Sequence, residues 1–271
     1  MDIAGRSAFI TGGANGIGLG IARQLAAAGV KLALVDIDTE ALGRAKAELG
    51  ELVSVVTAVL DVRDRDAYAR VADVVEDAVG PISLLFNNAG VSGAFPVAKL
   101  NYDMWDWVIG INLYGVINGV QTFLPRIVER GEGGYIVNTS SGAGLAATAS
   151  GTLYCTSKFG VVGLSEALHH ELAPANIGVS VLCPGPVATD LPRRSADARP
   201  EADLTLEERS QAADRVAMVT DFLSRGATPD EVGHMVLAAI GEGRLFIHTD
   251  RLMAEAVAAR SSAILAAVPA A

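Results

Sequence analysis

Short runs of β-branched and aliphatic residues alternate with longer segments of helical period along nearly the whole chain. This alternation constrains the fold most, because strands that alternate with helices form βαβ units around a parallel sheet. Continuous apolar runs such as residues 32–35 are typical of strands buried on both faces. The predicted strands span residues 7–11, 31–36, 53–60, 82–87, 134–139, 179–183 and 245–247. The predicted helices span residues 17–28, 40–49, 64–79, 104–130, 154–173 and, less regularly, 206–240.

The predicted fold class is α/β, with a doubly wound parallel sheet of about seven strands and helices on both faces. The 271 residues would allow two domains of roughly 150 residues, but single α/β domains of about 200–250 residues are common. Residues 1–185 contain no linker rich in Pro, Gly or Ser, so we expect one domain over residues 1–271. The charged segment 190–225 interrupts the pattern after a predicted strand, which indicates a substrate loop or lid at about residues 186–226.

The charge balance excludes several partners. With 21 Lys and Arg against 31 Asp and Glu, the formal charge is -10, which repels phosphate backbones and anionic lipid headgroups. We therefore expect a small-molecule substrate, and neither nucleic acid nor a membrane as a partner. The uncharged stretches 80–98 and 133–157 are interrupted by glycine and polar residues and do not read as spanning helices. Asp2 stands where a secretory signal needs a base, so the expected location is cytoplasmic.

Residues that could bind a metal lack the required spacing. Cys155 and Cys183 form no CxxC or Cys/His motif, so we expect buried apolar residues in a reducing compartment. His169 and His170 are followed by Glu171, but the H-E-x-x-H spacing of a zinc helix is missing. No metal is expected.

A glycine-rich turn follows the first predicted strand. Residues 11–18 read T-G-G-A-N-G-I-G, and a predicted helix begins there. In a strand–turn–helix of this kind, backbone N–H groups can approach a pyrophosphate, whose charge the helix N-terminus also favours. The alternative is a turn whose glycines only provide positive φ.

Asp36, at the end of the second predicted strand, favours the cofactor interpretation. An acid at this place can accept both ribose hydroxyl hydrogens of an adenosine and repels a 2′-phosphate, which indicates NAD rather than NADP. No base is available for that phosphate, because position 15 is Asn15 and position 37 is Ile37. Asp61, after the third predicted strand, fits either the adenine side or an N-cap of the next helix.

Tyr154 and Lys158 lie four residues apart on a predicted helix and therefore share one face. An ammonium about 4 Å from the phenol, at an effective dielectric near 20, contributes roughly 4 kcal/mol. This interaction would bring the phenol pKa from about 10 to around neutrality. Such a phenol can take a proton from an alcohol or return it to a carbonyl. A snorkelling surface pair is the alternative for two such residues taken alone.

Three further features accompany this pair: Ser141, thirteen residues before Tyr154; Asn112 in the preceding helix; and the turn Asn87-Asn88-Ala89-Gly90 after the fourth strand. In type, order and spacing, these motifs resemble the short-chain dehydrogenase/reductase family, in its branch of about 250 residues. The resemblance covers residues 4 to about 189. It implies a single-domain Rossmann-type fold.

The resemblance also implies residue roles. Ser141 would hydrogen-bond the reacting oxygen, and Tyr154 would be the acid/base. Lys158 would bind the nicotinamide ribose and lower the tyrosine pKa, while Asn112 would hold a water in a proton relay. Strand alternation points Ser140 and Ser141 to opposite faces, and the family spacing favours Ser141. The implied cofactor-binding residues are Gly12, Asn15, Gly16, Ile17, Gly18, Asp36, Ile37, Asp61, Val62, Asn88, Ala89, Gly90, Tyr154, Lys158, Pro184, Gly185, Val187 and Thr189.

The expected activity is NAD-dependent interconversion of a secondary alcohol and a ketone, on a hydrophobic or aromatic substrate. Segments 1–22 and 101–125 are similar to bacterial dehydrogenases that oxidise the benzylic alcohol of lignin-derived aryl ethers. A steroid or other cyclic secondary alcohol is the alternative substrate, and a non-catalytic dinucleotide sensor the alternative function. The resemblance also implies a homo-oligomer, a dimer or tetramer, in which helices 104–130 and 154–173 pair.

Overall fold

The strands form one parallel sheet in a computed structural model that describes residues 1–271 except 94, 96, 148–150, 201–204 and 270–271. The sheet order is β3-β2-β1-β4-β5-β6-β7, and every neighbouring pair is parallel. The predicted doubly wound α/β fold with seven strands is confirmed. The strands are β1 (Ser7–Thr11), β2 (Lys31–Asp36), β3 (Val55–Val59), β4 (Ile82–Asn87), β5 (Gly134–Thr139), β6 (Ile177–Cys183) and β7 (Phe246–His248).

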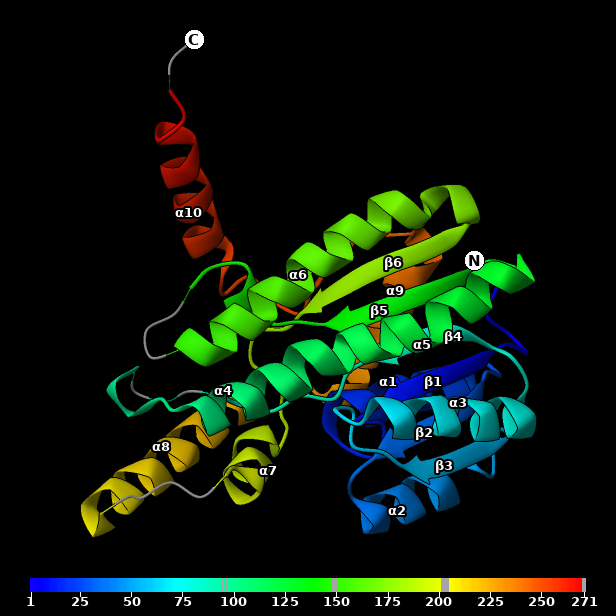
Figure 1. The fold of residues 1–271 in the computed structure, drawn as a ribbon, viewed down its shortest axis with the longest axis horizontal. Helices are drawn as coiled ribbons and strands as arrows, with labels where there is room; N and C mark the ends of the chain where they lie inside the picture. The colour runs from blue at the N-terminus through cyan, green and yellow to red at the C-terminus, as the bar shows by residue number, and fades with distance from the viewer. Residues whose placement is uncertain (94, 96, 148–150, 201–204, 270–271) are drawn as a thin grey trace.

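Helices cover both faces of the sheet (Figure 1). One face carries α1 (Gly16–Ala27), α2 (Thr39–Leu49) and α9 (Pro229–Glu242), and the other carries α3 (Arg65–Val79), α5 (Gly115–Arg130) and α6 (Thr152–Leu172). Successive strand residues point to opposite faces, so β1 sends Ile10 into the first core layer and Phe9 into the second. Phe9 packs its ring 4.5 Å from that of Phe123 on α5 and 5.9 Å from that of Tyr68 on α3.

The predicted helix 104–130 is interrupted by a π-helical turn. It consists of α4 (Tyr102–Ile109), the turn η2 (Gly110–Tyr114) and α5, which continue one another. Its length and apolar composition would suffice to cross a membrane, yet half of the most apolar window is buried inside the protein. The buried core helices of soluble proteins also reach this length and hydropathy. Single π-helical turns are often found at functional sites, and this one contains Asn112.

Four helices differ from the prediction. Residues 206–240 form two helices, α8 (Leu206–Ser224) and α9, because residues 225–228 leave the helical conformation. Pro229 then occupies the first position of a new helix, whose capping box pairs Thr228 with Glu231. The charged excursion contains α7 (Leu191–Ala198), and α10 (Ala254–Ala266) follows β7; neither was predicted. In α10 no residue is buried, so the sequence lacks the amphipathic period that identifies a helix.

The carboxyl ends of the strands lie at one edge of the sheet, and α7, α8 and the beginning of α10 gather there (Figure 1). The short 3-10 helices η1 (Val97–Lys99) and η3 (Gly142–Gly144) belong to loops at the same edge, whereas η4 (Ala173–Ala175) follows α6. In doubly wound sheets, ligands bind at this edge where the strand order reverses. Here the order reverses between β1 and β4.

Candidate active site

The glycine-rich turn after β1 packs against the turn after β4. Gly12 and Gly16 have φ of 61° and 49°, in the left-handed region that favours glycine. A Cβ at Gly18 would overlap the Gly12 carbonyl oxygen and lie 2.6 Å from Asn88 Nδ2. The two turns are joined by Thr11, whose Oγ1 accepts hydrogen bonds from the N–H groups of Asn88 (2.9 Å) and Ala89 (3.0 Å). Glycine at position 18 therefore allows the two turns to pack closely against one another.

The turn fits a dinucleotide pyrophosphate. Asn15 is the N-cap of α1, but its side chain caps no N–H group of the helix. Its buried Nδ2 has no hydrogen-bond partner among the described residues. A buried donor without a partner is costly, so a ligand oxygen would satisfy it. Ile17 and Gly18 follow in the first turn of α1, whose N-terminus favours an anion. Thr189, from the segment after β6, lies beside Gly16.

Asp36 lies at the end of β2 with only 8% of its surface exposed. Its Oδ1 accepts a hydrogen bond from the Asp38 N–H at 3.1 Å, while Ile37 between them is exposed. Arg194, on α7, reaches both carboxylates: its guanidinium nitrogens lie 3.8 Å from Asp36 Oδ1 and 3.2 Å from Asp38 Oδ2. The sequence indicated only that the segment 190–225 is charged. No local pattern in this segment indicates that Arg194 contacts the end of β2.

Asp61 is paired with Arg63 and does not cap α3. Arg63 donates to the Asp61 carboxylate at 3.0 Å through Nε and at 2.6 Å through Nη2. These hydrogen bonds hold the pKa of Asp61 below its ordinary value. The N-cap of α3 is Asp64, which accepts from the Ala67 N–H, so the capping alternative for Asp61 is wrong. Val62 is buried, and its carbonyl oxygen accepts from Asn118 Nδ2 at 2.8 Å.

The turn after β4 lies between the glycine-rich turn and α6. Asn87 donates from Nδ2 to Asn138 Oδ1 at 2.9 Å, which links β4 to β5. Asn88 donates to the Thr11 carbonyl oxygen at 3.1 Å. A Cβ at Gly90 would lie 3.2 Å from Asn112 Oδ1 and 3.5 Å from Lys158 Nζ. The structure therefore brings the β4 turn, the π-helical turn and Lys158 together.

Tyr154, Ser141 and Lys158 meet at the N-terminal part of α6. The half-buried Tyr154 shares a side-chain hydrogen bond with Ser141. Lys158 is 3% exposed; its Nζ donates to the Thr139 carbonyl oxygen at 3.0 Å and lies 5.7 Å from the centroid of the Tyr154 ring. Ser140 points elsewhere, because its Oγ donates to the Lys158 carbonyl oxygen at 2.8 Å. The structure thus places Ser141 and not Ser140 beside Tyr154.

The ionisation of the pair differs from the expectation. Burial raises the pKa of Tyr154, and the hydrogen bond with Ser141 opposes this only in part. Burial also lowers the pKa of Lys158 to about 8. The expectation that Lys158 brings the phenol pKa to around neutrality is therefore wrong for the protein without its cofactor. The physical reason is that desolvation disfavours both charged forms, and the ammonium is directed to the Thr139 carbonyl.

Asn112 is fully buried in the π-helical turn. Its Oδ1 accepts from the Val91 N–H at 2.8 Å, and its Nδ2 donates to the Val91 carbonyl oxygen at 3.0 Å and to Ser157 Oγ at 3.3 Å. Both amide N–H groups are thus used within the protein. A water at this residue would have to donate to one of its oxygens. The proton relay through Asn112 stays a prediction, and Ser157 is an additional residue that fixes its position.

The segment after β6 is covered by the residues that follow β7. Pro184 and Val187 are buried, and the Gly185 N–H donates to Thr249 Oγ1 at 3.0 Å. A Cβ at Gly185 would overlap the carboxylate of Asp250. The sequence pattern indicated Gly185 but gave no sign of Thr249 or Asp250, because residues beyond the last predicted strand carried no motif.

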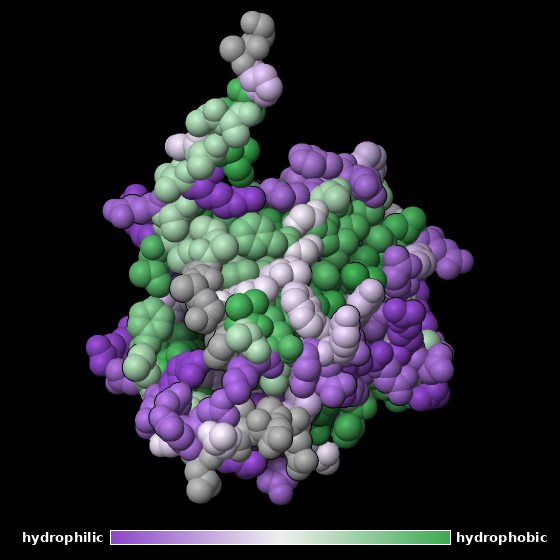
Figure 2. Space-filling model, turned by 60° about the vertical axis from the view of Figure 1, so that its left-hand side comes forward, coloured by the Kyte–Doolittle hydropathy of each residue, from purple (hydrophilic) through white to green (hydrophobic). Residues whose placement is uncertain are grey.

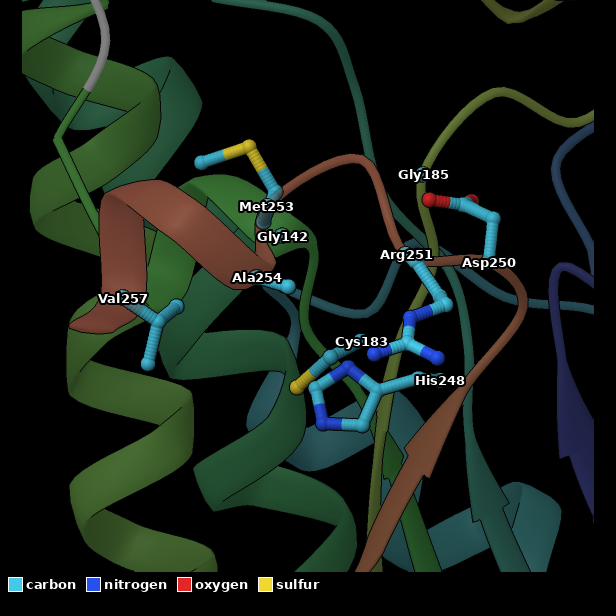
Figure 3. A pocket seen from close by; sticks show the side chains of 9 residues that line it. All are labelled: Gly142, Cys183, Gly185, His248, Asp250, Arg251, Met253, Ala254 and Val257. Carbon is cyan, nitrogen blue, oxygen red and sulfur yellow. The ribbon is translucent and has the colours of Figure 1, made fainter.

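A cavity of about 350 Å³ lies beside this segment, next to Gly142, the residue after Ser141. Figure 3 shows Met253 above Gly142, and the side chains of Arg251 and His248 close together beside Cys183. Cys183 and Cys155 are buried and form no disulfide, which confirms the expectation of buried cysteines. In the described part of the chain, no group of three His, Cys, Asp or Glu residues could hold a metal ion.

A doubly wound sheet with a glycine-rich turn at the strand-reversal point, and with a Tyr–Lys pair beside the loop after β4, defines a dinucleotide-dependent oxidoreductase. A family model described as short chain dehydrogenase matches residues 6–200. The chain belongs to this family. It is an enzyme that uses NAD to interconvert a secondary alcohol and a ketone.

Individual relatives cover most of the chain. A C alpha-dehydrogenase of Sphingobium sp. (strain NBRC 103272 / SYK-6) is 36% identical over 248 residues, 91% of this chain and 81% of the relative. The 3beta-hydroxysteroid dehydrogenase 2 of Eggerthella lenta is 36% identical over 191 residues, 70% of this chain and 74% of the relative. A short chain dehydrogenase/reductase of Burkholderia phymatum, solved in complex with NAD, is 32% identical with a TM-score of 0.91, covering 100% of this chain and 99% of that one.

Proposed function

We propose that this enzyme oxidises a benzylic or similarly hydrophobic secondary alcohol to its ketone, or catalyses the reverse, with Tyr154 as acid/base. The observation that carries the proposal is the side-chain hydrogen bond between Ser141 and Tyr154, whose ring lies 5.7 Å from the Nζ of the buried Lys158. Two hydroxyls that already share a hydrogen bond can both reach one substrate oxygen. Geometry of this kind polarises a carbonyl and positions the proton for transfer.

Each residue of the pair has a distinct role in the proposal. Ser141 donates a hydrogen bond to the substrate oxygen, and Tyr154 removes its proton in oxidation or supplies it in reduction. When bound, NAD supplies the hydride acceptor, and NADH the donor. Lys158 would hold the nicotinamide ribose with the N–H groups that Thr139 does not use. With a pKa of about 8, its amine is mostly charged at pH 7.

The proposed cofactor seat runs along the edge of the sheet. The turn at Gly12, Asn15 and Gly16 would hold the pyrophosphate, and Asp36 the adenosine ribose. The orphaned Asn15 Nδ2 and the position of Asp36 at the end of β2 support this assignment. Ile17 and Gly18 would belong to the pyrophosphate turn, and Asp61 and Val62 would lie at the adenine. Pro184, Gly185, Val187 and Thr189, in the segment after β6, would border the nicotinamide end.

Apolar surroundings support a hydrophobic substrate. Leu153, beside Tyr154, belongs to a buried cluster with Met104, Trp107 and Val108, against which Val91 and Phe95 pack. A Cβ at Gly93 would lie 3.5 Å from Tyr154 Cβ, so this loop lies against the tyrosine. The resemblance of segments 1–22 and 101–125 to dehydrogenases of benzylic alcohols favours an aromatic alcohol, and a C alpha-dehydrogenase is among the relatives of the chain.

The test is a comparison of the wild type with Tyr154→Phe and Ser141→Ala on a panel of benzylic, alicyclic and steroid alcohols. We expect NADH formation with the benzylic members, loss of about 10³-fold or more in kcat for Tyr154→Phe, and about 10²-fold for Ser141→Ala. NAD affinity should change little in Ser141→Ala. Tight NAD binding without turnover of any alcohol would instead support the dinucleotide sensor.

A steroid or other cyclic alcohol is a second candidate substrate, favoured by the similarity to the 3beta-hydroxysteroid dehydrogenase. The same panel separates the two. A kcat/KM for a 3β-hydroxysteroid at least tenfold above that for every benzylic alcohol would select the steroid.

We also propose a cytoplasmic homo-oligomer, a dimer or tetramer. The helix α10 projects from the body of the protein and presents mostly hydrophobic residues (Figures 1 and 2). Ile264 and Leu265 are 51% and 71% exposed. An isolated helix of this length is marginal in water, so a second copy that covers it would stabilise it. Sedimentation velocity of the full chain and of a chain ending at Leu252 tests this: a monomeric full chain contradicts it. Cell fractionation tests the location.

A further inference from the structure

The excursion after β6 is fastened at three points to elements at the carboxyl edge of the sheet. Ser195 on α7 accepts at Oγ from the Ser92 N–H at 2.8 Å, which ties α7 to the loop after β4. Lys99, in the same loop, pairs with Glu208 of α8 at 2.6 Å. The third point lies on the far side of the strand-reversal point, where Arg194 reaches the end of β2.

The contact of Arg194 differs from an ordinary surface ion pair. Asp36 is 8% exposed, and the Arg194 and Asp38 side chains are 39% and 33% exposed, so all three groups are partly or largely shielded from water. Asp38 has a fixed position, because it is the N-cap of α2 and accepts from the Ala41 N–H at 2.9 Å. The pKa of Asp38 is lowered mainly by this hydrogen bond. The positive charge of Arg194 is the next largest interaction that lowers it.

We propose that Arg194 is a positioning residue that holds α7 against the adenosine end of the proposed cofactor seat and thereby links dinucleotide binding to the docking of α7. The inference rests on the proposed function, in which Asp36 holds the adenosine ribose. Arg194 contacts Asp36 through Oδ1, which also accepts from the Asp38 N–H. The second carboxylate oxygen of Asp36 accepts no hydrogen bond from the described residues and stays free for ribose hydroxyls.

Electrostatics give the direction of the effect. Asp36 and Asp38 place two negative charges beside the seat proposed for a diphosphate, and the glycine-rich turn contains no basic residue. Arg194 offsets these charges, assisted by Arg44, which also lowers the pKa of Asp38. Removal of the Arg194 charge therefore weakens dinucleotide binding and releases α7 from β2. If Arg194 only stabilised α7, its removal would release α7 from β2 without weakening dinucleotide binding.

The experiment uses Arg194→Gln, Arg194→Lys and the matched control Arg193→Gln. Arg193 is the preceding residue of the same helix, is exposed, and makes no ion pair with Asp36 or Asp38. Two quantities are measured for each protein: the Kd of NADH by fluorescence titration at low and high salt, and amide hydrogen exchange of residues 191–198 without cofactor. Exchange reports local opening of α7 independently of any activity.

We expect Arg194→Gln to raise the Kd of NADH about threefold to fivefold at low salt, the range for a partly exposed ion pair, and to accelerate exchange of α7. Arg194→Lys should restore part of both effects, and Arg193→Gln should change neither. At high salt the difference in Kd should shrink, because screening weakens the wild-type interaction.

A second variant tests whether Asp38 is the residue through which Arg194 holds α7. Asp38→Asn retains the N-cap, since asparagine caps as well as aspartate, but removes the charge that Arg194 contacts. In this background, Arg194→Gln should accelerate α7 exchange much less than in the wild type. An equal acceleration in both backgrounds would show that Asp38 does not hold the helix, which overturns the inference.

The other possible results of these measurements also test the inference. An unchanged Kd in Arg194→Gln overturns the link to the dinucleotide, and a lower Kd shows that Arg194 blocks the ribose seat and overturns it as well. Failure of the wild type to bind NADH would overturn the proposed function. The exchange of α7 in Arg194→Gln would still decide whether Arg194 fastens the helix.

Discussion

Replacement of Lys158 by methionine should make the protein more stable while it inactivates the enzyme. The lysine is 3% exposed, and burial lowers its pKa from 10.5 to about 8. A group with a lowered basic pKa holds its proton less tightly in the folded than in the unfolded state. The charged lysine therefore destabilises the fold at neutral pH, and methionine, of similar length, lacks the charge.

The magnitude follows from the two pKa values. Their difference corresponds to about 3 kcal/mol of destabilisation at pH 7, where both states are mostly protonated. The unfolded chain binds more protons between pH 8 and pH 10.5, so this destabilisation declines as pH rises through that window and is about 1 kcal/mol at pH 9.5. Loss of the hydrogen bond to the Thr139 carbonyl subtracts about 1 kcal/mol at either pH.

Urea unfolding of the cofactor-free protein at pH 7 and pH 9.5 measures the effect. We expect Lys158→Met to raise the free energy of unfolding by about 2 kcal/mol at pH 7 and by less than about 1 kcal/mol at pH 9.5. Lys46→Met, at an exposed position of α2, is the control and should give the same difference at both pH values. A destabilised Lys158→Met at pH 7, or an advantage that does not shrink with pH, would refute the reasoning.

Three further outcomes follow from the structure. Gly18→Ala should weaken NAD binding at least tenfold by calorimetry, because its methyl group would overlap the Gly12 carbonyl; unchanged affinity contradicts the proposed pyrophosphate seat. Gly20→Ala should destabilise the protein by about 1–3 kcal/mol in urea, since its methyl group would overlap the Pro229 carbonyl and separate α1 from α9; an unaffected midpoint contradicts this packing. Alcohol oxidation should accelerate from pH 7 to pH 9, because the raised pKa of Tyr154 leaves little phenolate at neutrality, and initial rates that fall with pH would exclude it as the base.

The sheet was predictable because most of its strands are buried on both faces and therefore appear as uninterrupted apolar runs. β2 and β4 have the predicted bounds. β3 is shorter than its predicted range 53–60, since it is an edge strand whose residues are only partly buried and whose pattern fades at both ends. The helix α10 was not predicted at all, because none of its residues is buried and its sequence shows no amphipathic period.

Part of the site was predictable from the spacing of its motifs. Helical period places Tyr154 and Lys158 on one face of α6, and the thirteen-residue spacing of the family favoured Ser141, whose side chain is the one that shares a hydrogen bond with Tyr154. Arg194 and Asp36 meet through folding of the excursion over the sheet, and no local pattern encodes that contact. The direction of the Tyr154 pKa was also beyond the sequence, because it depends on burial and on where the Lys158 ammonium points.

The opposite shifts of Tyr154 and Lys158 have a common cause. Neither group has a counter-ion beside it in the described structure, so desolvation favours the neutral phenol and the neutral amine together. The Thr139 carbonyl occupies one of the three N–H groups of the ammonium, and the other two donate to no acceptor among the described residues. Ribose hydroxyls would supply those acceptors and favour the charged amine. If so, saturating NAD should raise the pKa of Lys158 and lower that of Tyr154, and the stability advantage of Lys158→Met should disappear when NAD is present.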